Sequence, residues 1–152
     1  MKITFIGAGS VQFTTAVVHD ITTYPALDGA EICLMDIDAY RLEKIKRCAE
    51  HIKDEMGSDI RITSTTSREE GLTGADAVIC TVFNGDVDIW QHEILIPKKY
   101  GVDINIGDTR SVSGIFRALR NIPLMLDICR DIERICPNAI MLNYTNPMSM
   151  LC

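Results

Sequence analysis

The sequence predicts an α/β fold with a doubly wound, Rossmann-type parallel sheet. Three observations support this prediction. An apolar run at residues 2–6 ends abruptly in a glycine turn at residues 7–10, and a second apolar run at residues 31–35 ends in Asp36. Further short apolar runs alternate with helical patterns along the rest of the chain. A strand that ends in a glycine turn, followed by a strand that ends in an acidic residue, is typical of a dinucleotide-binding βαβ unit.

The glycine turn contains the first candidate cofactor contacts, which are Gly7, Ala8, Gly9 and Ser10. The two glycines permit a tight turn and a close approach of the backbone to a pyrophosphate. The helix that follows directs its first N–H groups and the positive end of its dipole toward the same anion. Gln12 occupies the third glycine position of the G-x-G-x-x-G pattern, so the turn by itself is weak support.

Asp36 is the next candidate cofactor contact, and it indicates NAD rather than NADP. A carboxylate at the end of the second strand reaches the ribose hydroxyls of the adenosine and repels the extra phosphate of NADP. Its separation from Gly9 exceeds the usual spacing of about 20 residues, and a loop at residues 23–29 accounts for the difference. The alternative is a plain strand–turn–helix with a surface aspartate.

The composition favours a single globular domain whose partners are small molecules or other proteins. The chain has 152 residues, of which 47% are hydrophobic, and a formal net charge of −6. This charge argues against binding to nucleic acids or to anionic membranes, which need clustered Lys and Arg. No apolar run approaches the ~18 residues of a membrane span, and the first residues do not resemble a signal peptide. We therefore expect a cytoplasmic protein.

The cysteines are expected to be reduced. Several fall inside apolar strand or helix runs, where core thiols are more common than a disulfide framework. Neither a C-x-x-C pair nor a cluster of histidines occurs, so the sequence predicts no metal site within these residues. The six cysteines are Cys33, Cys48, Cys80, Cys129, Cys136 and Cys152.

The rest of the chain is expected to continue the alternation of helices and strands. Residues 39–56 repeat apolar side chains at three- and four-residue steps, which predicts an amphipathic helix. Continuous apolar runs at residues 77–82 and 139–143 predict strands that are buried on both faces. Residues 115–136 predict a helix that Pro123 interrupts, with a kink or a restart near Asn121, because proline lacks an N–H group and clashes with the preceding turn.

Asparagines follow two of these strands and are further candidates. Asn84 follows the strand at residues 77–82, while Asn143 and Asn146 lie at the end of the strand at residues 139–143. Ligands of parallel sheets bind at the carboxyl ends of the strands. We therefore expect Asn84 and Asn143 to lie beside the cofactor, and Asn146 to face the nicotinamide half and a substrate hydroxyl. The alternative is that these asparagines only form turns.

A polar loop at residues 107–114 follows a short extended stretch at residues 102–106. Its side chains Asp108 and Arg110 are of the kind that bind hydroxyl groups. They either hold a polar substrate such as a sugar or pair with each other on the surface.

Four separated segments resemble glycoside hydrolase family 4, in particular its α-galactosidase and α-galacturonidase branch. The segments are residues 3–10, 34–38, 117–120 and 141–148, and the resemblance follows the whole chain in order. The family is similar in fold to the lactate and malate dehydrogenases, and it does not use the two-carboxylate scheme of most glycosidases.

The resemblance implies hydrolysis of a glycosidic bond by redox-assisted elimination. In that chemistry NAD+ takes a hydride from C3 of the sugar, a base removes the C2 proton, the glycosidic oxygen leaves from C1, water adds and the hydride returns. A divalent metal, usually manganese, polarises the C2 and C3 oxygens. The resemblance also implies cofactor contacts at Gly7, Gly9, Ser10 and Asp36, and a substrate contact at Asn146.

The catalytic base and the metal ligands of the family are expected beyond Cys152. We therefore expect residues 1–152 to be a truncated NAD-binding Rossmann domain that lacks the catalytic C-terminal portion, with no catalytic residue and no metal ligand of its own. The sequence also departs from the family at residues 111–114, where relatives typically carry Gly-Pro-Gly-Gly and this chain has Ser-Val-Ser-Gly. This difference leaves the preferred sugar open.

Two other functions fit the same residues. One is a 2-hydroxyacid dehydrogenase of the lactate or malate type, and the other is a stand-alone NAD-binding module without catalysis. The family resemblance favours a small-molecule sugar as the partner. A sheet that lacks its later strands has an open edge and uncovered apolar surface, so we also expect a homo-oligomer.

Overall fold

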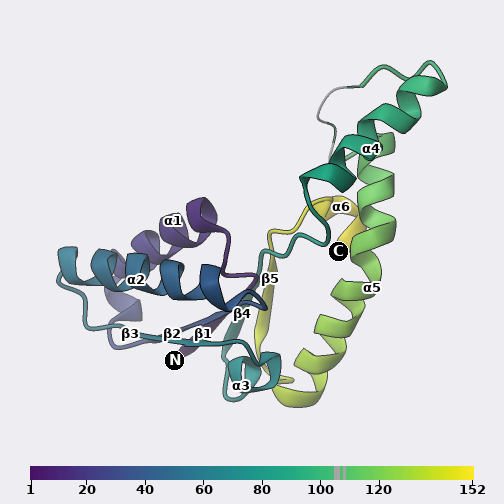
Figure 1. The fold of residues 1–152 in the computed structure, drawn as a ribbon. Coiled ribbons are helices and arrows are strands. Elements are labelled where there is room, and N and C mark those ends of the chain that lie inside the picture. The colour runs from purple at the N-terminus through teal and green to yellow at the C-terminus, as the bar shows by residue number, and fades with distance from the viewer. Residues whose placement is uncertain (105–106, 108) are drawn as a thin grey trace. The chain divides into compact units, whose positions relative to one another are not determined.

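The structure, a computed structural model, describes residues 1–104, 107 and 109–152. The expected extended stretch at Asn105 and Ile106, and the candidate Asp108, lie outside these described residues. The chain divides into two compact units, whose elements are labelled in Figure 1. The sheet unit contains Met1–Val82 and Asp131–Leu142, and the helical unit contains Phe83–Arg130 and Asn143–Cys152.

The sheet unit is built on five strands in the order β3-β2-β1-β4-β5 (Figure 1). β1 pairs in parallel with both β2 and β4, and β2 pairs in parallel with β3. This order is that of a doubly wound sheet, so the predicted fold class is confirmed. The strands are β1 (Lys2–Ile6), β2 (Glu31–Met35), β3 (Arg61–Thr65), β4 (Ala77–Cys80) and β5 (Ile140–Asn143).

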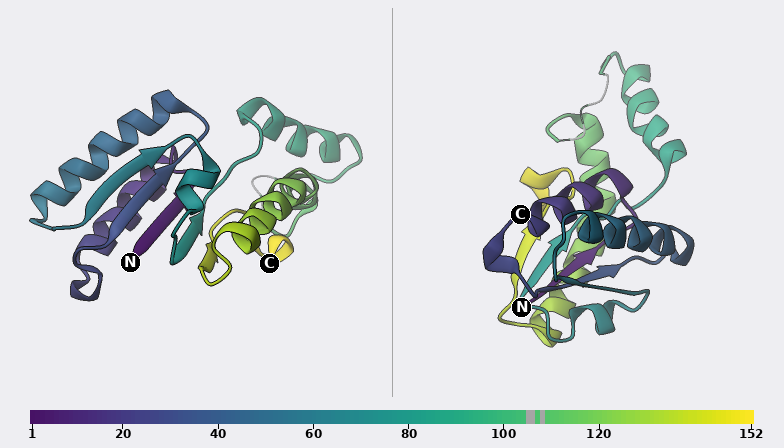
Figure 2. Two further views of the ribbon diagram at one scale, coloured as in Figure 1. Left: turned by 90° about the horizontal axis from the view of Figure 1, so that it is seen from below. Right: turned by 90° about the vertical axis from the view of Figure 1, so that its left-hand side faces the viewer.

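Helices cover both faces of this sheet, with α1 and α2 on one face and α3 on the other (Figures 1 and 2). Alternate side chains of a strand point to opposite faces. In β1, Ile3 and Phe5 join the main apolar core with α1 and α2, while the Thr4 hydroxyl donates to the Gly71 carbonyl of α3 at 2.8 Å. The helices are α1 (Val11–Thr22), α2 (Ala39–Glu55) and α3 (Arg68–Leu72), with a short 3₁₀ turn at Pro25–Leu27.

An ion-pair network fixes α3 against the end of α5 (Val112–Ile135) within the sheet unit. Ser67 caps α3 by accepting a hydrogen bond from the Glu70 N–H at 3.3 Å. The next residue, Arg68, pairs with Asp131, and Arg134 donates to the same carboxylate at 3.1 Å. The hydrogen bond from Arg134, together with the hydrogen bond and charge of Arg68, lowers the pKa of Asp131 below its usual value. The two arginines therefore favour the ionised form of the Asp131 carboxylate.

α5 differs from its prediction at both its start and its middle. It begins at Val112, so residues expected in the polar loop form its first turn, where the Ser111 hydroxyl accepts from the Gly114 N–H at 3.4 Å. It then continues through Pro123 without interruption. Proline deprives the Leu119 carbonyl of its usual helical donor, and Leu119 is exposed to solvent, which can hydrate that carbonyl. The other helices of the helical unit are α4 (Val87–Lys99) and α6 (Met148–Leu151).

β5 was expected to be buried on both faces, and that expectation is wrong. Ile140 and Leu142, which share one face of the strand, are 66% and 43% exposed. β5 is the last strand in the sheet order, and the described residues cover these two side chains only in part. An apolar run shows that side chains need burial, but it does not show which polypeptide supplies the cover. β4, in contrast, is buried as predicted, with Val78, Ile79 and Cys80 all in the core.

All six cysteines are free thiols, as expected. Burial raises the pKa of the Cys136 thiol, which holds it in the unreactive protonated form. Within the described part of the chain, no helix combines the length and apolarity needed to cross a bilayer.

Candidate nucleotide-binding site

The turn after β1 is a position that only glycine can occupy. Gly7 has a φ of +88°, and a Cβ atom placed there would lie 2.7 Å from the carbonyl oxygen of Thr81. The Gly7 carbonyl accepts a hydrogen bond from the Thr81 hydroxyl at 3.0 Å. β1 and β4 are the strands at which the strand order reverses, and this is where doubly wound sheets bind nucleotides. The absence of a side chain lets the backbone of the two strands meet there.

Ala8 shapes the same turn from inside the protein. Its side chain is fully buried, its N–H donates to the Met35 carbonyl at 3.0 Å, and its own carbonyl accepts from the Thr14 hydroxyl at 2.8 Å. Both backbone groups are therefore engaged by the protein. A direct contact between Ala8 and a cofactor stays a prediction.

The start of α1 is open to an anion. Ser10 is the N-cap residue, but its side chain makes no capping hydrogen bond, and Ser10, Val11 and Gln12 are exposed. The first N–H groups of a helix have no acceptor within the helix, and they carry the positive end of its dipole. Because Gln12 points to solvent, it does not disturb the packing of α1 on the sheet, which is the usual reason for a third glycine.

Asp36 lies directly against the glycine turn. Its Oδ2 accepts from the Gly9 N–H at 2.7 Å, and its Oδ1 accepts from the Asp38 N–H at 2.9 Å. A Cβ atom at Gly9 would lie 2.7 Å from Oδ2, so Gly9 is needed to admit this carboxylate. Each carboxylate oxygen retains a further acceptor position. Gly7, Gly9, Ser10 and Asp36 are thus brought together within the sheet unit, as a ribose and a pyrophosphate would require.

Asn84 belongs to the helical unit, where it is tied to α5. Its Nδ2 donates to the Arg120 carbonyl at 2.9 Å, and Arg120 Nε donates to the Asn84 carbonyl. The amide nitrogen therefore holds the loop before α4 onto α5. Its predicted cofactor contact remains untested.

Asn143 and Asn146 also belong to the helical unit and differ in how they are used. The Asn143 amide closes a turn, since its Oδ1 accepts from the Thr145 N–H at 2.9 Å and its Nδ2 donates to the Thr145 carbonyl at 3.3 Å. The Asn146 side chain is exposed, and its carbonyl accepts from Asn121 Nδ2 at 3.0 Å. The Asn146–Pro147 bond is cis. The exposed amide makes Asn146 the better candidate for a ligand contact.

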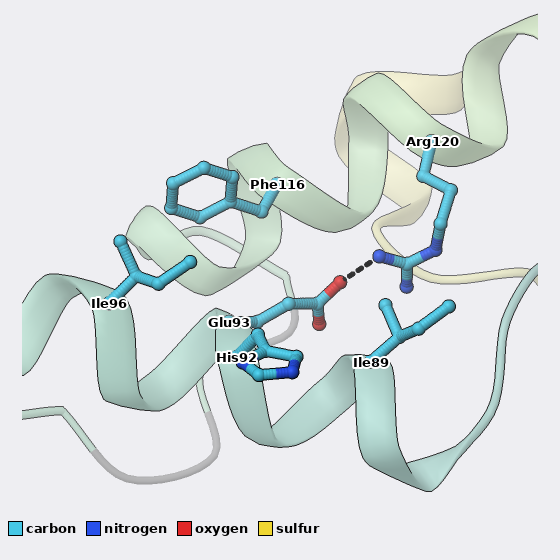
Figure 3. A pocket seen from close by; sticks show the side chains of 6 residues that line it. All are labelled: Ile89, His92, Glu93, Ile96, Phe116 and Arg120. Carbon is cyan, nitrogen blue, oxygen red and sulfur yellow. Dashed lines mark hydrogen bonds and ion pairs between the residues drawn. The ribbon is translucent and has the colours of Figure 1, made fainter.

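Glu93 and Arg120 form a buried ion pair that sequence reasoning missed. Figure 3 shows the two side chains pointing toward each other from α4 and α5, at a cavity of about 140 Å³. Glu93 is 3% exposed, and its Oε2 lies 3.7 Å from Nε of the buried Arg117. The Arg117 guanidinium packs over the ring of Trp90 at 5.5 Å. The available signal was the helical spacing of Trp90 and Glu93, which puts a charge on an inward face.

Comparison with known proteins shows which family the chain resembles. The model of the family 4 glycosyl hydrolases matches residues 2–152. An α-galactosidase from Rhizobium meliloti (strain 1021) is 41% identical over 150 residues, which cover 98% of this chain and 31% of that protein. An α-galactosidase from Bacillus subtilis (strain 168) is 42% identical over 151 residues, which cover 99% of this chain and 35% of that protein. The chain thus spans about a third of the length of these relatives.

A solved structure agrees with these relatives. A 6-phospho-β-glucosidase from Thermotoga maritima, determined with manganese, NAD+ and glucose-6-phosphate, has a TM-score of 0.81 and 26% sequence identity. The match covers 97% of this chain and 34% of that one. The range matched by the family model includes the glycine turn, Asp36 and the Asn146–Pro147 segment, so the resemblance seen in the sequence is confirmed. The chain belongs to the family 4 glycosyl hydrolases.

Proposed function

We propose that residues 1–152 form the NAD-binding part of an α-glycosidase of the α-galactosidase type, which hydrolyses glycosidic bonds by redox-assisted elimination. The observation that carries this proposal is the Asp36 carboxylate, 2.7 Å from the Gly9 N–H, in a chain of this family. A carboxylate beside a glycine turn favours NAD over NADP. The names of the two α-galactosidases support the substrate class, and the NAD+ and manganese of the solved relative support the cofactors.

The residues of this chain bind and orient the reactants in this proposal. NAD+, when bound, supplies a hydride acceptor for a hydroxyl-bearing carbon of the sugar. The first N–H groups of α1 bind the pyrophosphate, Asp36 accepts from the ribose hydroxyls, and the Asn146 amide holds a substrate hydroxyl. We also propose that the whole protein uses Mn²⁺ or another divalent metal. Among the residues that the structure describes, no three His, Cys, Asp or Glu side chains lie together as metal ligands, so no metal role is given to them.

The test is a glycosidase assay on the natural, full-length protein. We expect p-nitrophenol release from p-nitrophenyl α-galactoside in the presence of NAD+ and Mn²⁺, and loss of this release when NAD+ is removed. A 6-phosphorylated α-glucoside assayed in parallel reports on the substrate subclass. NADH-linked reduction of oxaloacetate or pyruvate would instead favour the dehydrogenase alternative, and tight NAD+ binding without turnover would favour a non-catalytic module. The relatives described above support neither alternative.

Replacing Asp36 by alanine is expected to weaken NAD+ binding by about 10- to 100-fold, because hydrogen bonds to a charged acceptor contribute about 1.5–3 kcal/mol. NADP+ binding should weaken less, since the repulsion of its extra phosphate disappears with the carboxylate. The ratio of the two dissociation constants, measured by titration calorimetry, should therefore narrow.

Asp38→Ala is the matched control for this prediction. Asp38 caps α2 by accepting from the Tyr40 and Arg41 N–H groups at 3.0 and 3.1 Å, and it also contacts Asp36 through its own N–H. Its loss should cost about 1 kcal/mol of stability and leave the NAD+/NADP+ ratio unchanged. Dissociation constants that stay the same in Asp36→Ala would remove the ribose assignment.

We further propose a cytoplasmic location and a homo-oligomeric assembly. Six free cysteines support a reducing compartment. Ile115, Leu119 and Leu126 are all about half exposed or more, at spacings that place them on one side of α5. This apolar side of α5 and the exposed side chains Ile140 and Leu142 of β5 both favour contact with another polypeptide, which supports the proposed assembly.

A further inference from the structure

Asn121 is a buried polar residue in the middle of a helix, and packing alone does not explain it. It lies on α5, is 1% exposed, and is among the largest fully buried side chains. Its Nδ2 donates to the Asn146 carbonyl at 3.0 Å. Its Oδ1 is buried without a hydrogen-bond partner among the described residues. Burying an amide group that lacks one of its hydrogen-bond partners is unfavourable. The hydrogen bond that Asn121 donates to Asn146 therefore calls for an explanation other than packing.

The orientation of this amide follows from its partner. A backbone carbonyl only accepts hydrogen bonds, so the side-chain atom 3.0 Å from the Asn146 oxygen must be the NH₂ group. The bond joins residues 25 positions apart, and both belong to the helical unit. It therefore ties the loop after β5 to the interior of α5.

The segment around Asn146 is held on both sides, while its own side chain is exposed. Thr145 and Pro147 are both buried, and the Asn143 amide fixes Thr145 through two hydrogen bonds. The Asn121 bond then fixes the carbonyl of Asn146 itself. An amide on a fixed main chain has only its side-chain rotamers left to order, so it loses less conformational entropy when it binds a ligand.

We infer that Asn121 is a positioning residue that holds the main chain at Asn146 so that the Asn146 amide meets the substrate in a single orientation. This inference rests on the substrate contact proposed for Asn146. Asn121 does not touch the substrate. Its effect passes through the carbonyl of Asn146, and it should therefore disappear when the Asn146 amide is absent.

The test is a double-mutant cycle in the natural, full-length protein, assayed with p-nitrophenyl α-galactoside, NAD+ and Mn²⁺. Asn121→Leu keeps the volume and removes the donor. We expect it to lower kcat by about tenfold, the effect of one lost hydrogen bond, with little change in KM or in NAD+ affinity. In an Asn146→Ala background the same substitution should lower kcat by less than about twofold, because the side-chain amide that Asn121 positions is gone, although the carbonyl that it bonds remains.

Met125→Ala is the control for a purely structural role. Met125 is buried on the same helix, 4% exposed, so its truncation destabilises α5 without removing the hydrogen bond from Asn121 to the Asn146 carbonyl. Hydrogen exchange measured by mass spectrometry supplies a readout besides activity. Deuterium uptake in a peptide spanning residues 143–148 should rise in Asn121→Leu and stay at the parent level in Met125→Ala.

The outcomes separate this inference from the proposed function. If Asn146→Ala leaves kcat and KM unchanged, the substrate contact fails, and the inference fails with it. If Asn146→Ala lowers kcat but Asn121→Leu does not, or if the two effects are additive, only the inference is overturned. An equal loss of kcat in Met125→Ala would also overturn it, since general destabilisation of α5 would then explain the result.

Discussion

Replacing Glu93 by glutamine is expected to lower the free energy of unfolding by about 3–5 kcal/mol, the cost of breaking a buried ion pair. The substitution keeps the shape of the side chain but removes the negative charge that Arg120 and Arg117 share. The side chains of Glu93, Arg117 and Arg120 are 3%, 8% and 20% exposed, so water has little access to the two guanidinium groups that lose their counter-charge. Urea denaturation of the natural protein, followed by circular dichroism, measures the change.

Glu133→Gln provides the comparison for this substitution. Glu133 is exposed on α5, and its replacement should change stability by less than about 0.5 kcal/mol. A similarly small change in Glu93→Gln would show that the pair contributes no net stability. The loop at Asn84 should respond as well, since Arg120 bonds both to Glu93 and to the Asn84 carbonyl.

Gly7→Ala is the second substitution with a large expected effect. A φ of +88° costs an alanine about 1–2 kcal/mol. The new Cβ would also lie 2.7, 2.9 and 3.0 Å from three backbone atoms of Thr81 and Val82, which cannot move aside as a flexible side chain can. Forcing an extra carbon into a packed site adds about 1–3 kcal/mol. We therefore expect a total loss of about 2–5 kcal/mol, measured by urea denaturation, and weaker NAD+ binding.

Gly57→Ala separates the two contributions. Gly57 follows α2 with a φ of +61°, but a Cβ there meets no atom within 4 Å. Its replacement should cost only the backbone part, about 1–2 kcal/mol. If both variants lose the same stability, the contact between β1 and β4 is not the reason for glycine at position 7.

The glycine turn and Asp36 were predictable because their signals are local. A strand, a turn and the start of a helix follow one another there within a few residues. Each of them requires residue types that can be recognised in a single sequence. The same holds for α2, whose apolar spacing gave its extent to within one residue of the observed Ala39–Glu55. Local pattern and tertiary fold agree in these elements.

The features that the sequence did not reveal depend on contacts between distant segments. Asn121 meets Asn146, and Glu93 meets Arg120, across separations of 25 and 27 residues. The helical spacing of Trp90 and Glu93 places Glu93 on an inward face, but it does not show which distant residue pairs with it, and the same is true of Asn121. The expected restart at Pro123 is also absent from α5, because a helix within a folded unit tolerates the loss of one helical hydrogen bond, which isolated helix propensity does not anticipate.

The cysteines allow local unfolding of the sheet unit to be measured, because some of them are buried and others are exposed. Cys33, Cys80 and Cys136 are buried, and all three belong to the sheet unit. Cys48 and Cys152 are exposed. A thiol reagent should therefore modify the exposed pair at once, reach the half-buried Cys129 more slowly, and reach the three buried thiols only when the sheet unit transiently unfolds. The rate of that slowest phase, compared with the rate of the exposed thiols, gives the free energy of local opening in the sheet unit without any introduced cysteine.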